Sequence, residues 1–126
     1  LLSGFRELIL EPQSDIDRVR AWLLEHGFFL AQENFVEEDG KYYPMMKVRY
    51  APEKFVQQPK LTDGDFLFGP MLLQAHHAVL HSYLLREQRI QKDVLKQLAA
   101  QKQTPAIVQR TKEVEVHLQL VEQSLW

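Results

Sequence analysis

Residues 8–13 have the sequence LILEPQ, in which an apolar run ends at a proline and predicts a buried β-strand. Residues 14–26 then predict an amphipathic helix with Ser14 or Asp15 as its N-cap, and Gly27 fits the left-handed turn at its end. The apolar face of this helix comprises Ile16, Val19, Ala21, Trp22, Leu23 and Leu24. Buried strands joined by a helix belong to sheets with further strands and with helices on both faces. We therefore expect an α/β fold whose N-terminal half is missing.

Two paired strands are predicted next, over residues 28–36 and 45–50. The second strand alternates, so that every other residue from Met46 to Tyr50 lies on one face. Between the strands, Asp39-Gly40 favours a tight turn with positive φ, which predicts an antiparallel hairpin. Pro44 cannot donate a hydrogen bond to a neighbouring strand, so we expect it at the start of the second strand or in a bulge.

The C-terminal part of the sequence predicts two long helices. Residues 71–101 contain no Pro or Gly and carry an interrupted apolar stripe, which indicates one continuous helix. Thr104-Pro105 matches an N-cap followed by proline at the first helical position, and the second helix runs towards Trp126. Its apolar stripe comprises Ile107, Thr111, Val114, Leu118, Val121 and Leu125. Alternating steps of four and three residues indicate a coiled-coil seam, and the short link requires the helices to form an antiparallel hairpin.

These elements predict three regions. Residues 1–50 hold the last strands and helix of the α/β domain, residues 51–69 are a connector without a clear period, and residues 70–126 form an antiparallel helical coiled-coil domain. The 126 residues include no cysteine, which excludes a disulfide framework, a thiolate zinc site and a cysteine nucleophile. No apolar run of about 20 residues occurs, so we expect a soluble protein that does not span a membrane. The absence of cysteine is compatible with a reducing cytoplasm, which is the expected location.

Charge is distributed unevenly along the chain. The formal net charge is −2, yet residues 82–103 carry five Lys/Arg against two Asp/Glu. Within this segment Arg89, Lys92 and Lys96 share one helical face, and Arg86 precedes them by one turn. One interpretation is the solvated flank of a coiled coil. The other is a track for RNA phosphates, which confers affinity but no base identity.

Other candidate sites are weaker. His77 and His81 are four residues apart and, with His76, suggest a metal-dependent hydrolase. The HExxH pattern and a third ligand are absent, so packing or solvent-facing histidines are favoured and no metal is expected. The acidic residues 37–39 precede two tyrosines and form either a solvated loop or a group that holds a flat base by stacking and hydrogen bonding. No complete nucleotide-binding or hydrolase motif occurs.

Four segments occur in series. They are ELILEPQ at residues 7–13, RAWL at 20–23 with Gly27-Phe28, EEDGKYY at 37–43, and GPML at 69–72 opening a long helix. In this order and spacing they resemble the C-terminal half of TrmK-type bacterial tRNA methyltransferases. The resemblance covers nearly the whole chain.

The resemblance implies an S-adenosylmethionine-dependent enzyme that methylates N1 of the adenine at tRNA position 22. The implied fold is a Rossmann-like methyltransferase domain followed by a coiled-coil domain that helps to hold the tRNA. The strands predicted above would be the last three of a seven-stranded sheet, with the hairpin giving the antiparallel strand. The cofactor would be bound mainly by the missing N-terminal half, so no cofactor ligand or catalytic residue is assigned, and the fragment alone is expected to be inactive.

The resemblance also indicates binding residues. The rim of the base pocket would comprise Pro12, Gln13, Glu38 and Tyr43. The tRNA-binding residues would be Arg86, Arg89, Lys92 and Lys96. Family members commonly read Gln-Pro-Asn where this chain has Glu11-Pro12-Gln13, and they place Glu where this chain has Pro44. The second departure excludes a catalytic carboxylate at that position.

An alternative function class stays open. The helical hairpin would also suit a non-enzymatic module that pairs with another protein helix or with itself. In addition, the first strand would leave an open sheet edge, and such edges favour self-association.

Overall fold

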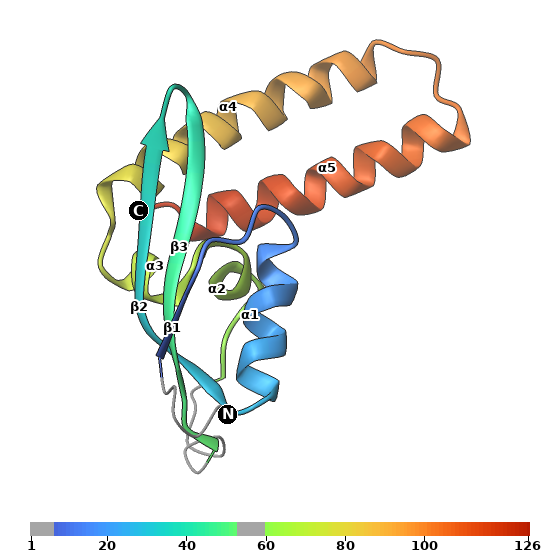
Figure 1. The fold of residues 1–126 in the computed structure, drawn as a ribbon. Helices are drawn as coiled ribbons and strands as arrows, with labels where there is room; N and C mark the ends of the chain where they lie inside the picture. Colours follow the sequence, from blue (N-terminus) through green and yellow to red (C-terminus); the bar gives the residue numbers. More distant parts are fainter. Residues whose placement is uncertain (1–6, 53–59) are drawn as a thin grey trace. The chain divides into compact units, whose positions relative to one another are not determined.

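The computed structural model describes residues 7–52 and 60–126 of the chain (Figure 1). The chain divides into two compact units, unit 1 (Leu1–Leu80) and unit 2 (His81–Trp126). Unit 1 contains a β-sheet with short helices, and unit 2 contains most of the length of two longer helices. Within the described ranges, no helix is long and apolar enough to cross a membrane.

A three-stranded sheet forms the centre of unit 1. Its strands are β1 (Glu7–Leu10), β2 (Phe28–Glu38) and β3 (Lys41–Tyr50), in the order β1-β3-β2. The central β3 is antiparallel to both neighbours, so β1 and β2 are parallel to each other. The turn between β2 and β3 has φ angles of 52° at Asp39 and 78° at Gly40. The predicted antiparallel hairpin is therefore confirmed.

Three helices lie on one side of this sheet: α1 (Ile16–Glu25), α2 (Asp63–Phe68) and α3 (Pro70–Gln74) (Figure 1). The buried core of unit 1 includes Leu23, Phe28, Met46 and Val48. Asp15 occupies the N-cap position of α1, but its side chain makes no capping hydrogen bond, because φ is 50° instead of the extended value typical of an N-cap. Gly27 has φ of 87°, as predicted for the turn after α1.

One strand and one helical side chain that were predicted to be buried are exposed. The prediction that β1 is a buried strand is wrong, since Ile9 is 69% exposed. Within unit 1, β1 pairs only with β3, and Ile9 lies opposite Lys47, on the other face of the sheet from Met46 and Val48, which pack with Leu23 of α1. Trp22, assigned above to the apolar face of the first helix, is 54% exposed and stacks on His26 with 4.1 Å between ring centroids.

Pro44 lies inside β3, opposite Phe35, so the prediction of a strand start or a bulge is wrong. The register shift of the hairpin falls elsewhere, between Leu30 and Gln32. β1 pairs with β3 only as far as Met46. At Pro44, that side of β3 consequently has no strand partner among the described residues, and the proline interrupts no hydrogen bond between β1 and β3.

The prediction of one helix over residues 71–101 is wrong. The chain breaks between α3 and α4 (Ala78–Ala99), where His76 adopts φ of 50°. The N–H groups of His76 and His77 donate to carbonyl oxygens of α3 over 3.2 and 3.0 Å, in the pattern of a Schellman motif. Glycine usually takes the left-handed position of this motif, so a histidine there gave no signal in the sequence.

The predicted connector contains a helix that the sequence analysis missed. Residues 53–59 of this connector lie outside the described residues, and α2 occupies much of the remainder. Thr62 Oγ1 accepts the N–H of Asp65 over 3.1 Å, and Asp65 Oδ2 accepts the N–H of Thr62 over 3.0 Å. This reciprocal capping box starts α2, and its sequence signature is a threonine followed three residues later by an acid.

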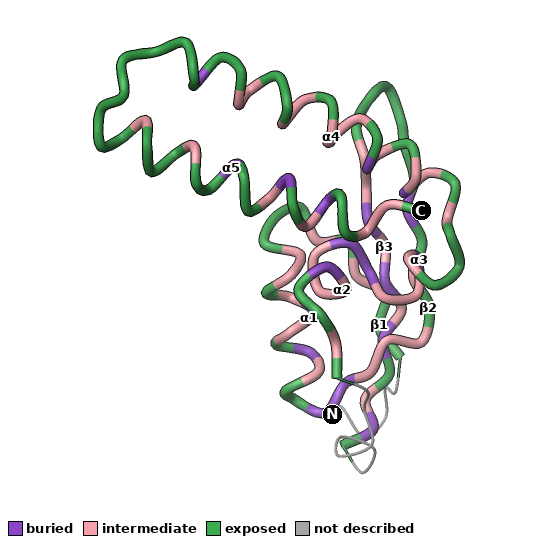
Figure 2. The backbone as a smooth tube through the Cα atoms, turned by 180° about the vertical axis from the view of Figure 1, so that it is seen from behind, coloured by how far each residue is buried: buried purple, intermediate pink, exposed green. Residues whose placement is uncertain are grey.

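In unit 2, α5 (Pro105–Ser124) runs back alongside α4 (Figure 1). Thr104 Oγ1 accepts the N–H of Ile107 over 3.2 Å, so the predicted N-cap is confirmed. The buried apolar residues of this unit are Leu84, Leu98, Val114, Leu118 and Val121. Figure 2 shows the buried positions of α5 recurring along one side of the helix, as its apolar stripe predicts.

Candidate functional site

Arg20 of α1 and Glu33 of β2 form a buried ion pair that the sequence analysis did not identify. Arg20 Nε lies 2.9 Å from Glu33 Oε1, and the two side chains are 2% and 0% exposed. Burial lowers the pKa of the Arg20 guanidinium, and the negative charge and hydrogen bond of Glu33 oppose this shift. Each charge depends on the other, because an unpaired charge in a protein interior is strongly destabilising.

The same pair binds the backbone of two further helices. Arg20 Nη1 donates to the carbonyl of Phe66 in α2 over 2.6 Å. Glu33 Oε2 accepts the N–H groups of Met71 and Leu72 in α3 over 2.9 and 3.4 Å. The ion pair therefore joins α1, β2, α2 and α3, and it satisfies N–H groups that the first turn of α3 leaves without a helical partner.

Gly69 lies against this ion pair. Its φ is 101°, and a Cβ at this position would lie 2.8 Å from Glu33 Oε2 and 3.0 Å from Arg20 Nη2. Pro70 follows at the start of α3. The structure thus explains the residue types at the start of the segment 69–72. Its glycine lets the backbone pass close to a buried charge pair, and its proline starts a helix.

The residues predicted to form the base pocket lie at one end of the sheet. Pro12 and Gln13 follow the carboxyl end of β1, Glu38 ends the parallel strand β2, and Tyr43 lies near the start of β3. β1 ends level with Glu33, so Glu38 is about 17 Å further along β2 at the usual rise per residue. Gln13 and Glu38 are exposed, and Pro12 and Tyr43 are half-buried. The described contacts do not join the four into one pocket, and the pocket stays a prediction.

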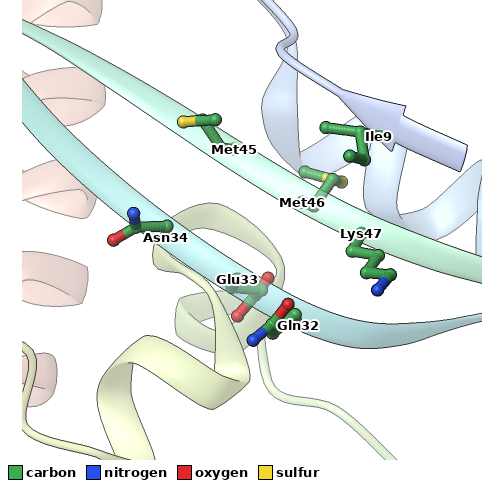
Figure 3. A pocket seen from close by; sticks show the side chains of 7 residues that line it. All are labelled: Ile9, Gln32, Glu33, Asn34, Met45, Met46 and Lys47. Carbon is green, nitrogen blue, oxygen red and sulfur yellow. The ribbon is translucent and has the colours of Figure 1, made fainter.

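A hollow is present on the sheet near the end of β1. Its lining residues are Ile9, Gln32, Glu33, Asn34, Met45, Met46 and Lys47. Figure 3 shows that these side chains come from all three strands. The buried Glu33 belongs to the opposite face, and Lys47 Nζ is paired with Glu7 over 2.9 Å, so the open part of the hollow offers mainly amide and apolar groups.

The histidines do not form a cluster in the described residues. His77 precedes α4, and its Nε2 lies 3.1 Å from Asn34 Oδ1. His81 lies inside α4 with its ring edge against Trp126, at 5.0 Å between centroids. Within residues 7–52 and 60–126, no group of three His, Asp or Glu side chains is placed to hold a metal ion. His77 and His81 therefore have separate neighbours.

The predicted tRNA-binding residues lie on α4, but their surroundings differ. A surface hollow on this helix is lined by Arg89, Ile90, Lys92, Asp93 and Lys96. Lys92 Nζ lies 3.7 Å from Glu122 Oε2 of α5. Arg86 also interacts with other groups, and its positive charge is one of the causes that lower the pKa of Glu87. Three of the four predicted cations thus line one hollow of α4.

Glu87 connects the two helices of unit 2. His117 Nε2 and the hydroxyl of Tyr83 each lie 3.4 Å from Glu87 Oε1. The hydrogen bond with His117 is the main cause that lowers the pKa of Glu87. A carboxylate with a lowered pKa stabilises the folded state above its unfolded pKa, and this contribution is lost as the pH falls through the folded pKa.

We expect the free energy of unfolding of unit 2 to decrease as the pH falls from about 5 through the lowered pKa of Glu87. Replacing Glu87 with glutamine should make this decrease smaller, because the neutral amide does not titrate. Urea unfolding monitored by circular dichroism at a series of pH values measures the effect. Equal pH dependence in the parent and the Glu87→Gln variant would contradict it.

Comparison with known proteins identifies the family. The model of the TrmK family, tRNA (adenine(22)-N(1))-methyltransferase, matches residues 1–123. The chain belongs to the TrmK family. The tRNA (adenine(22)-N(1))-methyltransferase of Bacillus subtilis (strain 168) is 25% identical over 122 residues, which cover 97% of this chain and 51% of that protein. The chain thus spans about half the length of this relative.

Solved structures agree with the family and indicate the fold. The crystal structure of Streptococcus pneumoniae Sp1610 in complex with S-adenosyl-L-methionine has a TM-score of 0.75 and 26% identity, covering 99% of this chain and 50% of that one. A Streptococcus agalactiae protein of the NADB-Rossmann superfamily has a TM-score of 0.78 and 22% identity, covering 99% and 50%. The expectation of part of a Rossmann-like α/β fold is confirmed, and the match lies in the C-terminal half of the TrmK family.

Arg20 is the first residue of the TrmK segment at residues 20–23, and its role was not predicted from the sequence. Arg20 is a charged residue between Val19 and Ala21, inside the apolar face of a predicted helix. Such a position indicates a buried charge with a partner, because lone buried charges are rare. The partner Glu33 has no comparable signal, since it is one of many acids in this half of the chain.

Proposed function

We propose that this chain is the tRNA-binding, C-terminal part of a cytoplasmic S-adenosylmethionine-dependent tRNA (adenine(22)-N1)-methyltransferase. Membership of the TrmK family over residues 1–123 carries this proposal. In the proposed arrangement, residues 1–50 complete the methyltransferase sheet and residues 51–69 connect it to the C-terminal region, residues 70–126, in which α4 and α5 form a coiled-coil arm that holds tRNA. Arg86, Arg89, Lys92 and Lys96 supply the cations of this arm.

The cofactor is assigned to the part of the relatives that this chain does not span. The sequence contains no glycine-rich loop of the kind that opens a dinucleotide or methionine-cofactor site, so none of its residues is assigned to the cofactor. When bound, S-adenosylmethionine supplies an activated methyl group on sulfur. We accordingly expect the 126-residue chain to have no transferase activity on its own.

The residues of this chain would act on the substrate base. N1 of adenine lies on the Watson-Crick edge, so the base must leave its stack before it reacts, and a pocket must hold it. Methyl transfer then requires alignment and exclusion of water more than a strong base. We propose that Tyr43 stacks on the extruded adenine and Glu38 borders it, while Pro12 and Gln13, which follow the shorter strand β1, form the far side of this rim.

A chimera tests the enzymatic proposal. Residues 1–126 would replace the matched half of the Bacillus subtilis relative, and reverse-transcription stops would report 1-methyladenosine at position 22 of an unmodified tRNA. We expect the chimera to methylate the tRNA, and neither half alone to do so. Tyr43→Ala should lower kcat/KM of the chimera about tenfold because the stacking is removed, whereas Tyr43→Phe should retain most of it.

Three outcomes would contradict the proposal. One is a chimera that binds S-adenosylmethionine and unfolds cooperatively, yet transfers no more methyl groups than the cofactor half alone. Another is equal kcat/KM for Tyr43→Ala and the parent chimera, which would remove Tyr43 from the pocket. The third is methylation by the 126-residue chain alone, which would contradict the assignment of the cofactor to the other half.

A second candidate function is a non-enzymatic interaction module. The exposed Ile9 on the edge strand β1 favours it, because open sheet edges pair with other strands. Self-association through this edge would bury apolar surface and backbone groups, so added salt would weaken it little. Contacts with RNA phosphates weaken steeply with salt. The salt response of binding therefore separates the two functions.

A further inference from the structure

The cations along α4 are not equivalent. Lys92 Nζ lies 3.7 Å from Glu122 Oε2, and the same oxygen accepts a hydrogen bond from Gln88 Nε2 over 2.9 Å. Gln88 and Lys92 are four residues apart on α4, so the two side chains hold the Glu122 carboxylate from adjacent turns. By contrast, Arg89 and Lys96 form no ion pair with any residue that the structure describes.

The geometry points to Glu122 as a competitor of RNA phosphate for Lys92, which limits how tightly α4 binds a polyanion. A carboxylate and a phosphate offer a lysine ammonium the same kind of contact, namely a negatively charged oxygen acceptor. Although the Lys92 ammonium has three N–H donors, the negative charge of Glu122 beside it offsets part of its positive charge and repels a phosphate. This inference rests on the proposed function, since it concerns the same cationic face of α4.

Exposure makes the exchange possible. The side chains of Lys92 and Glu122 are 56% and 43% exposed, so solvent and a phosphate group can reach both. Exposed ion pairs contribute little to stability, so Lys92 can leave Glu122 at a small cost. Glu122 is nevertheless held by Gln88 when Lys92 leaves, and its charge stays beside the RNA. The RNA therefore meets both a weakened cation and a fixed negative charge at this point.

The expected consequence is a limit on binding to any RNA backbone. Phosphate contacts are independent of sequence, so an α4 whose Lys92 is not offset by Glu122 would bind other RNAs more tightly as well as the substrate. With Glu122 in place, Arg89 and Lys96 carry most of the attraction, and Lys92 contributes only part of a contact. Glu122 would thereby help the methylated product to dissociate.

Glu122→Gln tests the inference, because glutamine keeps an acceptor for Gln88 and removes the charge. We expect the full chain to bind an unmodified tRNA transcript roughly two- to fivefold more tightly in 50 mM KCl, the range expected for an exposed ion pair. The slope of log affinity against log salt should steepen by up to about 0.9, the value for one added phosphate contact.

Glu113→Gln is the matched control. Glu113 lies on the same helix, and its carboxylate is 3.7 Å from Arg110 with side-chain exposures of 55% and 58%. The control changes the net charge equally but leaves Lys92 and Glu122 untouched. We expect it to change the affinity much less than Glu122→Gln. In the double variant Glu122→Gln/Lys92→Gln, the gain over Lys92→Gln alone should shrink, because the cation that Glu122 occupies is gone.

The outcomes separate the inference from the proposed function. If the parent chain binds tRNA and loses affinity in Arg89→Gln/Lys96→Gln, but Glu122→Gln matches Glu113→Gln, the inference is wrong and the proposed function stands. If the parent chain has no salt-dependent affinity for tRNA, the proposed tRNA-binding function is wrong, and the inference is wrong with it. Tighter binding confined to Glu122→Gln supports both.

Discussion

Replacing Glu33 with alanine is expected to destabilise unit 1 by about 3–5 kcal/mol, the usual effect of removing one partner from a buried ion pair. The Arg20 guanidinium would remain buried without its ion-pair partner and with only the weaker attraction of Asp17, since its side chain is only 2% exposed. The N–H groups of Met71 and Leu72 would lose their acceptor at the same time. The substitution therefore acts on α1 and α3 together, which explains why we expect it to exceed an ordinary loss of packing.

Gln32→Ala is the matched control for this prediction. Gln32 is adjacent to Glu33 on β2 but is exposed on the other face of the sheet, so its removal should change stability by less than about 0.5 kcal/mol. Urea unfolding followed by the fluorescence of Trp22, in a Trp126→Phe background, reports unit 1. Equal midpoints for Glu33→Ala and Gln32→Ala would show that the ion pair does not hold the unit together.

Local patterns predicted the elements whose geometry is set by neighbouring residues. Asp39-Gly40 specified the hairpin because its residues tolerate positive φ, and Thr104 specified the start of α5 because its hydroxyl accepts a nearby N–H. The family was predictable because four segments retain their order and spacing, and the match over residues 1–123 confirms it.

The errors concern features that depend on distant residues. Arg20 and Glu33 are 13 residues apart, and Met71 lies another 38 beyond Glu33, so no local period reveals their contact. The break at His76 lacks the glycine that usually marks such a turn. The exposure of Ile9 follows from which strands and helices surround β1, and that is a property of the sheet as a whole.

The base-pocket and tRNA-binding residues were predicted through the resemblance, and they stay predictions. Their separation along the sheet is clear from the register, since β2 and β3 extend well beyond the end of β1. The differences among the cations of α4 were not predictable from the charge pattern alone. The contact between Lys92 and Glu122 requires α4 and α5 to lie side by side at one register.

We expect the triple variant Arg89→Gln/Lys92→Gln/Lys96→Gln to bind tRNA on the order of 100-fold more weakly than the parent chain, because each exposed ion pair with a phosphate contributes up to about 1 kcal/mol. All three side chains line the hollow of α4, so they can approach neighbouring phosphates of one strand. Lys92 should account for the smallest share, because Glu122 already engages it. The dependence of log affinity on log salt should become shallower, with a slope smaller in magnitude by about two.

The control variant Lys102→Gln/Arg110→Gln/Lys112→Gln removes the same charge from unit 2 without touching the hollow. It separates binding at the hollow from a general effect of net charge. Circular dichroism of both variants should match that of the parent chain, because all six side chains replaced are polar surface groups of unit 2.

A titration of the parent chain and these two variants with an unmodified tRNA transcript in 50 and 200 mM KCl tests whether the hollow of α4 binds tRNA. The account predicts that the parent chain and the control variant bind with affinities that fall steeply as salt rises, and that the hollow variant binds far more weakly with a shallower dependence. Equal affinity and equal salt dependence for the hollow variant and the control would contradict the claim that α4 is the tRNA-binding surface.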